Sequence, residues 1–412
     1  MGKLQAEARD LYTPRNFVRM LNHVPRRTRE QIADKHDYDY RARKVFFEPH
    51  LRAWVLFTWT QDETLRDMHA AVNEDPLYQL LGAGLDVSLG GLSEAHQKRP
   101  YAALVEVLEV ALARIERLPK SKRVLRELTP ELLQQVGDLL SQSLLFDSTT
   151  LRLPPRIKAW AEQQHDGDLP LKVHVRLHGG YGGLDRVVVV PEHEHDQQQY
   201  RELLDLAHPV EDHAIYLHDC GYRELCVYDE VVAHGHDFVT RFHSQTSVQQ
   251  VAERDLPPEK TLATGYTLIR DRIVTLGAND NQTTHDYRLI NVKDSAGKPL
   301  VILTSLLDLP VETVCALYYY RWTIEILFRW LKHVLSLQHL VSHTPNGIMM
   351  QIVATLLAYA LLVLYHQDGP LSLKQLCREL RFQLHAALYQ FGYQQGLHDA
   401  RAAPSPATLP VF

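Results

Sequence analysis

Hydrophobic positions recur with two different periods along the chain, and the change falls near Ser141. From Thr13 to about Leu81, apolar residues recur at helical spacing, and a further amphipathic helix is predicted from Tyr101 to Arg117. The Gly/Ser-rich stretch from Leu81 to Ser93 breaks this pattern and predicts a linker. The first part of the chain is therefore expected to be a small helical domain, followed by a linker and a helix.

After Ser141 the pattern is that of short strands. A helix with Asp196 as its N-cap is predicted from Gln197 to Leu206, before the fourth strand, and a shorter helix is predicted from Glu224 to Val231. The strands are expected at Ser143–Asp147, Leu171–Leu177, Arg186–Val190, Ile215–Asp219 and Phe238–Phe242. Three strands followed by alternating helix and strand is the order of a ribonuclease-H-like α/β fold, which is our fold prediction.

The alternation of helix and strand stops between His243 and about Pro310. Three β-type segments occur there, at Tyr266–Val274, Asp286–Val292 and Leu300–Ser305. Turn signals separate them at Gly277–Asn281 and Ser295–Lys298. We interpret this region as a β-rich insertion between the last strand of the core and its closing helix.

The segment from Val311 to Leu337 carries the strongest chemical signal. On one continuous helix, one tyrosine and four charged residues fall within roughly 80° of one another. These residues are Tyr318, Arg321, Glu325, Arg329 and Lys332. The rest of the helix is largely apolar, so its charged stripe needs a partner that compensates it, such as a cleft holding metal ions and phosphates. A ladder of ion pairs within the helix, through Arg321, Glu325 and Arg329, is the alternative.

Two aspartates fall where an α/β sheet gathers functional groups. Asp147 is expected to close the first strand and Asp219 the fourth. Either one alone would also fit a turn after a strand. Their joint placement favours a site at this edge of the sheet.

Composition and charge change this picture only locally. The chain of 412 residues is 45% hydrophobic and 23% charged, as in ordinary globular proteins, and its net charge of -6 does not indicate a nucleic-acid partner. Basic residues are dense only between Gln5 and Lys44, which suits a phosphate-facing surface and equally a solvated helical face. They are Arg9, Arg15, Arg19, Arg26, Arg27, Arg29, Lys35, Arg41, Arg43 and Lys44.

Two further features bear on location. The four cysteines are irregularly spaced in a chain that needs no disulfide framework, which is typical of a reducing, cytoplasmic compartment. The apolar segment from Ile348 to Tyr365 carries Gln351 and Thr355 and lies at the lower length limit for a membrane span. We interpret it as a buried helix and expect no membrane partner.

The stripe and the two aspartates together resemble a known family. Tyr318, Arg321, Glu325 and Lys332 reproduce the spaced tyrosine, arginine, glutamate and lysine signature of the insertion-sequence 4 family of DDE transposases. The run Asp147-Ser148-Thr149 resembles the first aspartate motif of that family. The run Asp219-Cys220-Gly221-Tyr222 resembles the second, although the family usually carries a basic residue where Cys220 stands.

The resemblance implies a two-metal site for DNA cleavage and strand transfer. Its catalytic, metal-binding carboxylates would be Asp147, Asp219 and Glu325, with two Mg²⁺ ions that Mn²⁺ could replace. The residues implied to contact DNA are Tyr318, Arg321, Lys332, Arg329 and, as a further candidate, Arg241. The implied partners are DNA, both the terminal inverted repeats and the target, and a second copy of the chain in a homodimeric synaptic complex.

The resemblance also gives each part of the chain an expected role. Residues 1–85 would be a helical domain that binds the DNA ends, and 86–140 a linker and helix. The core would comprise 141–243 and 311–366, the β-rich insertion 244–310, and a C-terminal helix and tail 367–412. In relatives that cut through a DNA hairpin, an aromatic residue of the insertion stacks on a flipped base, a role that Tyr266 or Tyr287 could fill here.

Two other functions stay open at this point. A zinc-dependent hydrolase could use His193, Glu194, His195 and Asp196, or the group His213, His218, Cys220 and Cys226, although neither has an established structural-zinc spacing. The second alternative is a DNA-binding protein that descends from a transposase and has lost catalysis. All three carboxylates are present, which speaks against such a loss.

Overall fold

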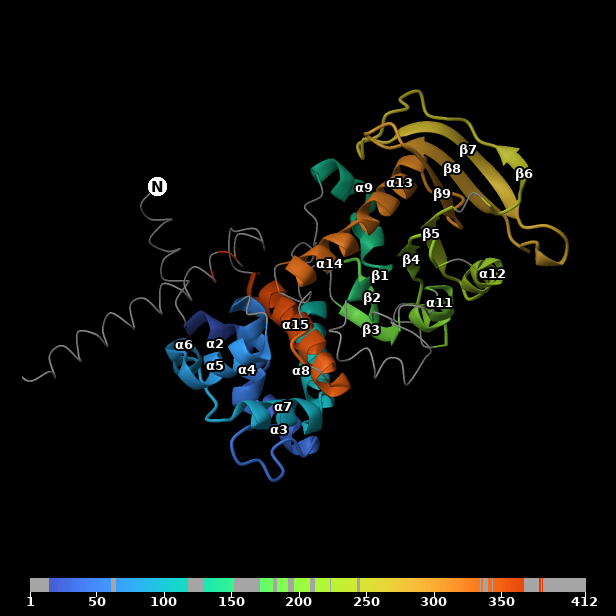
Figure 1. Ribbon diagram of the computed structural model, residues 1–412. Coiled ribbons are helices and arrows are strands. Elements are labelled where there is room, and N and C mark those ends of the chain that lie inside the picture. Colours follow the sequence, from blue (N-terminus) through green and yellow to red (C-terminus); the bar gives the residue numbers. More distant parts are fainter. Residues whose placement is uncertain are drawn as a thin grey trace, which may run out of the picture. The chain divides into compact units, whose positions relative to one another are not determined.

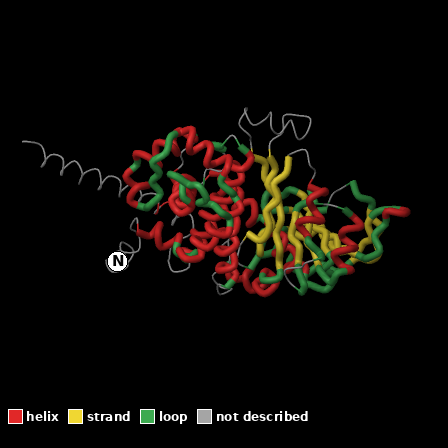
Figure 2. The backbone as a smooth tube through the Cα atoms, turned by 90° about the horizontal axis from the view of Figure 1, so that it is seen from below, coloured by secondary structure: helices red, strands yellow, loops and turns green. Residues whose placement is uncertain are grey.

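The computed structural model of the protein divides into two compact units. The first unit comprises Met1–Arg114 and Leu331–Phe412, and the second comprises Ile115–Trp330. The structure describes residues 15–60, 64–117, 129–151, 171–180, 184–191, 196–207, 212–222, 224–242, 245–333, 335, 340–342, 344–366, 378 and 380. In this part of the chain, the strands belong to the second unit and the first unit is helical (Figures 1 and 2).

The first unit is built from helices connected by short turns. They are α2 (Arg15–Leu21), α3 (Arg26–Lys35), α4 (Phe47–Thr60), α5 (Leu65–Glu74), α6 (Pro76–Leu80), α7 (Leu89–Lys98), α8 (Ala102–Glu116), which ends at the unit boundary, and α15 (Pro345–His366). Helix α7 begins inside the stretch that predicted a linker. Ser88 caps it by accepting a hydrogen bond from the Gly91 N–H, and Leu92 and Ala95 are buried on its inner side.

Helix α15 is the core helix of the first unit and packs against α2, α4 and α7. It is long and apolar enough to cross a membrane, with a mean hydropathy of 2.2, but 94% of that window is buried inside the protein. Two of its buried polar side chains are hydrogen-bonded: the Gln351 side chain accepts the Val341 N–H at 2.9 Å, and Thr355 donates to the Gln351 carbonyl at 2.7 Å. The prediction of a buried helix at this place is confirmed.

A buried ion pair joins α3 to α4. The Arg29 side chain is fully buried and binds both carboxylate oxygens of Glu48, at 2.7 and 2.8 Å. Its remaining donors bind the carbonyls of Leu21 and Val24, and Arg52 holds Glu48 from the other side at 2.7 Å. Arg29, one of the basic residues of the stretch 5–44, thus belongs to the core and faces no phosphate.

The second unit is built on one sheet of nine strands in the order β3-β2-β1-β4-β5-β9-β8-β7-β6. Strands β1, β2 and β3 are antiparallel, while β4 and β5 run parallel to β1. The bounds are β1 Ser143–Leu151, β2 Leu171–His178, β3 Leu184–Pro191, β4 Ile215–His218, β5 Asp237–Arg241, β6 Val248–Glu253, β7 Thr267–Leu276, β8 Tyr287–Lys293 and β9 Pro299–Thr304. The five predicted core strands and three of the four strands in the insertion are confirmed within a few residues.

The β-rich insertion continues the core sheet and does not form a sheet of its own. Strand β9 pairs antiparallel with β5, with Val239 opposite Thr304, and β8, β7 and β6 follow outward. The two predicted turns are present where glycines adopt positive φ, at Gly277 (φ 82°) and Gly297 (φ 80°). Strand β6 was not predicted, because it is an exposed edge strand in which apolar and polar residues do not alternate.

Helices cover both faces of the core sheet. On one face, α11 (Asp196–Leu204) and α12 (Leu225–Ala233) bury a cluster that includes Leu144, Phe146 and Tyr216. On the other face, α13 (Val311–Arg321) contacts β4, β5, β9 and α9 (Pro130–Leu140). Because successive side chains of a strand alternate between faces, Asp147 lies on the α13 face and its neighbour Ser148 on the α11 face.

One predicted strand end was wrong. Strand β1 does not close at Asp147 but continues to Leu151, because Thr149 and Thr150 pair with Val173 and Lys172 of β2. β-Branched threonines favour the extended backbone, so the strand continues through a motif that looked like a turn. Asp147 thus lies in the middle of a strand, where its backbone is held by pairing with Val175 of β2.

The Arg29 ion pair provides a test of the first unit. Arg29→Met should reduce the free energy of unfolding by about 3 kcal/mol or more, because it leaves the Glu48 carboxylate partly buried with one partner fewer. The measurement is urea unfolding followed by circular dichroism. Arg26→Met is the matched control in the same helix: its ion pair with Glu30 is exposed, so we expect a loss below about 0.5 kcal/mol. Equal losses in both variants would contradict the assignment.

Candidate active site

The sheet topology brings two of the predicted carboxylates onto neighbouring strands. Phe146 of β1 pairs with His218 of the parallel strand β4, so Asp147 and Asp219 are each the next residue along these strands. The third carboxylate, Glu325, lies in the first turn of α14 (Thr323–His333), which follows α13. Parallel pairing and the α13–α14 segment thus deliver the three groups from distant parts of the sequence.

The predicted continuous helix is interrupted at one residue. Helix α13 ends at Arg321 and α14 begins at Thr323, with Trp322 between them in a tight turn whose N–H donates to the Tyr319 carbonyl at 3.3 Å. The break is local, because the Trp322 backbone stays in the right-handed helical region and Arg321 and Glu325 still form an i,i+4 ion pair at 2.8 Å. Trp322 itself is 44% exposed.

Arg321 is the centre of the site. Its nearly buried guanidinium lies 2.8 Å from Glu325 and 3.6 Å from Asp147, and its Cζ lies 5.4 Å from the centre of the Tyr318 ring. Burial alone would lower the pKa of Arg321, but the surrounding groups raise it above its usual value. These groups are Tyr318, Asp147, Asp219 and Glu325. The guanidinium is therefore a fixed positive charge among three carboxylates.

The negative charges of Asp147 and Asp219 are only partly balanced by neighbouring positive charge and hydrogen bonds. Burial raises the pKa of Asp147 to about 7, with smaller raising effects from Glu325 and Asp219, against the lowering effect of Arg321 and of the Ser148 N–H. One carboxylate oxygen of Asp219, Oδ1, is buried without a hydrogen-bond partner in the described part of the chain. Together the carboxylates would gain from more positive charge than Arg321 supplies.

Part of the predicted charged stripe does not join this cluster. Arg329 is exposed, and no ion pair links it to Glu325 among the described residues, so only the first step of the predicted ion-pair ladder is formed. Lys332 is half-buried, its pKa lowered by that burial, and it belongs to the first compact unit. Arg241 is exposed at the end of β5, and its charge reaches Tyr318, whose pKa burial raises to about 12.

The neutral side chain of His218 fixes the backbone just before Asp219 through its contacts in the core. His218 is fully buried, and burial lowers its pKa to about 4. Its Nε2 is bonded to the Tyr200 hydroxyl at 3.0 Å, its Nδ1 lies 3.1 Å from both the Thr240 hydroxyl and the Asp219 carbonyl, and its ring stacks on Phe146. These contacts fix the end of β4, where Asp219 follows.

The same contacts bear on the zinc hypothesis. His218 is committed to core hydrogen bonds, and His213 is bonded to Asp237 at 2.9 Å. Within the described residues, no group of three or more His, Cys, Asp or Glu side chains is arranged to hold a metal ion. The run from His193 to His195 lies outside the described residues.

A fourth carboxylate, which the sequence suggested as a helix cap and as one of the alternative zinc ligands, lies on the α11 side of the sheet. Asp196 is the first residue of α11; its Oδ1 lies 2.6 Å from the Lys172 ammonium and accepts the Ser148 hydroxyl at 3.2 Å. Its other oxygen lies so close to Gly221 that a Cβ there would meet it at 2.7 Å. Asp196 thus ties β1, β2 and the loop after Asp219 together.

Helix α11 is held to the sheet at both ends. At its C-terminal end Arg176 of β2 donates to the carbonyls of Leu203 and Leu204, and Arg186 of β3 pairs with Asp205. At its N-terminal end Lys172 of β2 pairs with Asp196. The position of the Asp196 carboxylate next to Ser148 is therefore set by the packing of the whole helix. A local sequence motif could not have predicted it.

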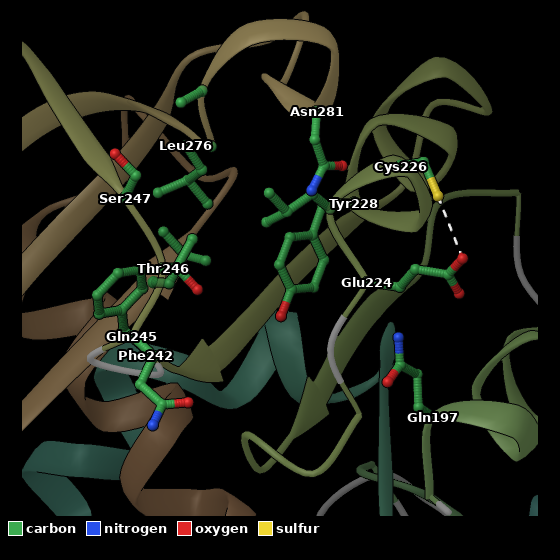
Figure 3. A pocket seen from close by; sticks show the side chains of 14 residues that line it. Gln197, Glu224, Cys226, Tyr228, Phe242, Gln245, Thr246, Ser247, Leu276 and Asn281 are labelled. Atoms are coloured by element: carbon green, nitrogen blue, oxygen red, sulfur yellow. Dashed lines mark hydrogen bonds between the residues drawn. The ribbon is translucent and has the colours of Figure 1, made fainter.

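A cavity of about 560 Å³ lies on the α11 and α12 side of the sheet, and neither Arg321 nor any of the three carboxylates lines it. Figure 3 shows its lining, in which Asn281 and Tyr228 face Glu224, Cys226 and Gln197 across the opening. Glu224 accepts a hydrogen bond from the Cys226 thiol at 3.3 Å. The lining residues are amides, hydroxyls, apolar groups and this one carboxylate, without any lysine or arginine. Such a lining does not suit phosphate.

The two tyrosines considered for base stacking differ in availability. Tyr287 is fully buried, and its hydroxyl donates to Asp229 at 2.7 Å, so its ring cannot receive a base. Tyr266 is half-buried and lies edge-on to Tyr319, with ring centres 6.0 Å apart. Of the two, only Tyr266 lies near α13.

A mixed α/β sheet that gathers three acidic side chains around one arginine defines a class of polar, charge-dense sites suited to phosphate chemistry. The chain matches the family described as transposase DDE domain over residues 140–361, and it belongs to this family. Residues 140–361 contain the whole sheet, α13 and α14. Proteins of this family generally use divalent metal ions and act on DNA.

Two similar proteins carry related names. A Sinorhizobium fredii protein named as a candidate transposase, y4zB, is 26% identical over 275 residues, which cover 66% of this chain and 69% of that protein. A Geobacillus stearothermophilus protein named as a candidate transposase for the insertion sequence element IS5377 is 24% identical over 271 residues, covering 66% of this chain and 65% of that protein. The second match thus spans just under two thirds of the relative.

One solved structure is similar along most of the chain. The piggyBac transposase in a synaptic complex with hairpin DNA covers 98% of this chain and 88% of its own, with a TM-score of 0.44 and 11% sequence identity. A TM-score of this size does not establish a shared fold. The family assignment rests on the match over residues 140–361.

The two ends of α11 provide a matched test of the Asp196 network. Asp196→Ala and Asp205→Ala each remove one carboxylate that pairs with a basic residue of the sheet, so both should reduce the free energy of unfolding by about 1–3 kcal/mol. Only Asp196→Ala should also slow metal-dependent DNA cleavage, because only Asp196 anchors the residue next to Asp147. The measurements are urea unfolding and single-turnover cleavage. Equal cleavage by both variants would show that Asp196 has a purely structural role.

Proposed function

We propose that the protein is a transposase of the insertion-sequence 4 family that binds the terminal inverted repeats of its element and catalyses Mg²⁺-dependent DNA cleavage and strand transfer. The observation that carries this proposal is the cluster of Asp147, Asp219 and Glu325 around the buried guanidinium of Arg321. Three of the four residues of the family signature, Tyr318, Arg321 and Glu325, lie in this cluster. The names of the two relatives point the same way.

The topology supports a ribonuclease-H-like core for this activity. Three antiparallel strands, β3, β2 and β1, are followed by the parallel strands β4 and β5, with α11 and α12 as the crossover helices. In this arrangement Asp147 lies in β1, and Asp219 directly follows the adjacent parallel strand β4. The β-rich insertion between β5 and α13 extends the same sheet and leaves the α13 face open to the carboxylates.

The donor set fits hard divalent cations. All three candidate ligands are carboxylates, which Mg²⁺ and Mn²⁺ prefer, and Asp219 has a buried oxygen without a partner among the described residues. The raised pKa of Asp147 also supports a cation site. Burial and the neighbouring carboxylates disfavour the charged form of Asp147, and a bound cation would favour it. The carboxylates do not yet converge as a ligand group, since Glu325 is paired with Arg321. Cation binding therefore competes with this ion pair.

Each residue then has a defined task. Bound divalent cations would activate the attacking water or 3′-hydroxyl and stabilise the leaving oxygen of an in-line phosphodiester displacement. Asp147, Asp219 and Glu325 hold that charge in place, and Arg321 can bind a phosphate with two parallel hydrogen bonds. Tyr318 holds the guanidinium of Arg321 in position through its ring.

Further DNA contacts are assigned to the two remaining cations of the stripe and to Arg241. Arg329 and Lys332 follow Glu325 in α14, and Arg241 lies at the end of β5 with its charge reaching Tyr318. Each would bind a phosphate as a single positive charge, which adds affinity that falls with salt. These assignments rest on the family signature for Lys332 and on exposure for the other two.

The helical first unit supplies the remaining parts of the proposal. The basic helices before Leu81 would bind the DNA ends, and a homodimer would pair two ends in the synaptic complex. Deleting the residues before Leu81 would not test this role cleanly, because α2 and α4 pack against α15 in the core of the unit. Point substitutions on the surface of this unit are the appropriate test.

A transposase-derived DNA-binding protein without catalysis is the second candidate. It would bind the same DNA ends but leave them uncut, as would a protein whose carboxylates never accept metal. The intact set of Asp147, Asp219 and Glu325 at one place favours an active enzyme.

The cleavage assay decides between these two functions. The unaltered protein should nick duplexes that carry the terminal repeats of its own element when Mg²⁺ or Mn²⁺ is present. Asp147→Asn, Asp219→Asn and Glu325→Gln should each reduce the rate by roughly 10²–10³-fold or more, since each weakens the binding of the divalent cations that would stabilise the transition state. Binding of the same duplex should change little.

The control for the cleavage assay is Asp205→Asn, which removes a carboxylate of similar exposure at the far end of α11. It should cleave at the rate of the unaltered protein. If Asp147→Asn cleaves equally fast, the assignment of Asp147 is wrong. If the unaltered protein binds the ends and never cuts them with either metal, the inactive DNA-binding protein is the correct interpretation.

A further inference from the structure

The first unit contains a groove of about 940 Å³ with a strongly basic lining. One wall is the loop between α3 and α4, and the other is the exposed side of α7 together with the residues that follow it. Two acidic residues, Asp37 and Glu94, also line it. The basic lining residues are Arg41, Arg43, Lys44, Lys98 and Arg99. The groove thus has more positive charge than its own acidic residues can balance.

The pairing of these charges leaves two guanidinium groups available. Lys44 is bonded to Asp86 at 2.9 Å and Lys98 to Glu94 at 2.6 Å, both on the exposed surface. Neither Arg41 nor Arg43 has an ion-pair partner among the described residues, and both are exposed. A surface that keeps two unpaired guanidinium groups in one groove is suited to bind an anion.

The loop that carries these arginines is held in one conformation. Arg99 donates to the carbonyls of Tyr38 and Tyr40, and Asp39 accepts the Phe47 N–H at 2.6 Å. Arg41 itself adopts a positive φ of 53°, which an arginine keeps only when its surroundings hold it there. The guanidinium groups are therefore presented from a fixed backbone, which reduces the entropy lost on binding.

An exposed aromatic ring adds to this arrangement. Tyr40 is 65% exposed, and the Arg41 Cζ lies 5.0 Å from the centre of its ring. The two side chains form a cation–π contact, and both residues line the groove. Tyr40 is thus an exposed aromatic without a packing role, and its position beside Arg41 accounts for it.

We propose that this groove binds the sugar-phosphate backbone of duplex DNA without reading its sequence, through Arg41 and Arg43. The identity of the anion rests on the proposed function, because a transposase has DNA as its polyanionic partner. Guanidinium groups bind phosphates with two parallel hydrogen bonds, and phosphate contacts position a protein on DNA while base contacts specify the sequence. No asparagine or glutamine side chain lines the groove, so it lacks the amides that pair with adenine, and its two unpaired arginines are assigned to phosphates.

The test compares a groove variant with a charge-matched control. Arg41→Ala combined with Arg43→Ala should weaken binding to a duplex with the terminal repeat and to a random duplex of equal length by the same factor. The plot of log K against log salt concentration should lose about 2 from the magnitude of its slope, because two phosphate contacts disappear. Arg114→Ala combined with Arg117→Ala removes the same charge from exposed positions outside the groove and after Leu81, and should leave the slope unchanged.

Folding and cleavage are measured beside binding. The groove variant should unfold in urea with the midpoint of the unaltered protein, since neither arginine has a structural ion pair among the described residues. At saturating DNA and low salt it should cleave at the unaltered rate, because it keeps Asp147, Asp219 and Glu325. These two results would show that the loss lies in binding alone.

The possible results distinguish a failure of the groove proposal from a failure of the proposed function. An unchanged salt slope in the groove variant, with normal binding and cleavage by the unaltered protein, would overturn the groove proposal and leave the transposase intact. A loss confined to the terminal-repeat duplex would also overturn it, because the groove would then read sequence. If the unaltered protein binds no duplex at all, both proposals fail together.

Discussion

The guanidinium of Arg321 is the interaction on which the arrangement of the second unit depends. Three carboxylates from β1, β4 and α14 approach one another away from bulk water, and such an arrangement is unfavourable without a positive charge among them. Arg321 supplies that charge from the last turn of α13, paired with Glu325 at 2.8 Å and near Asp147 at 3.6 Å. It compensates them only in part, because the pKa of Asp147 stays raised and one oxygen of Asp219 stays without a partner among the described residues.

Strand β1 contributes side chains to both faces of the sheet. Asp147 points to α13 and the charged cluster, and the next residue, Ser148, points to α11 and is held by Asp196. The backbone of β1 is paired with both β2 and β4 as far as Phe146, and Asp147 and Ser148 continue the pairing with β2, so the same paired backbone holds both side chains. The α11 face, with its neutral His218 and the Asp196–Lys172 pair, thus serves as the rigid support of the α13 face.

The sequence allowed the order of the core elements and the charged cluster to be predicted, and the structure shows why the rest was not accessible. Tyr318, Arg321 and Glu325 were predictable because helical spacing places them on one face, and the turn at Trp322 leaves that spacing intact. The continuation of β1 beyond Asp147 depends on pairing with β2, which no local pattern reveals. The role of Asp196 likewise depends on how α11 docks on β2. Periodicity predicts single elements, whereas these features belong to contacts between elements.

Local charge density has the same limit in the first unit. Arg29 and Arg43 lie in one basic stretch and are equivalent by composition, yet Arg29 is fully buried with Glu48 while Arg43 is exposed in a groove. The difference arises because Arg29 lies on the inner side of α3, where two carbonyls and a carboxylate accept its donors, whereas Arg43 lies in a loop without such acceptors. A cluster of basic residues in a sequence therefore sets an upper bound on the charge that can face DNA. Basic residues that are buried in ion pairs, such as Arg29, do not add to the positive charge at the surface. In this unit Arg41 and Arg43 do add to it, in the groove beside α7.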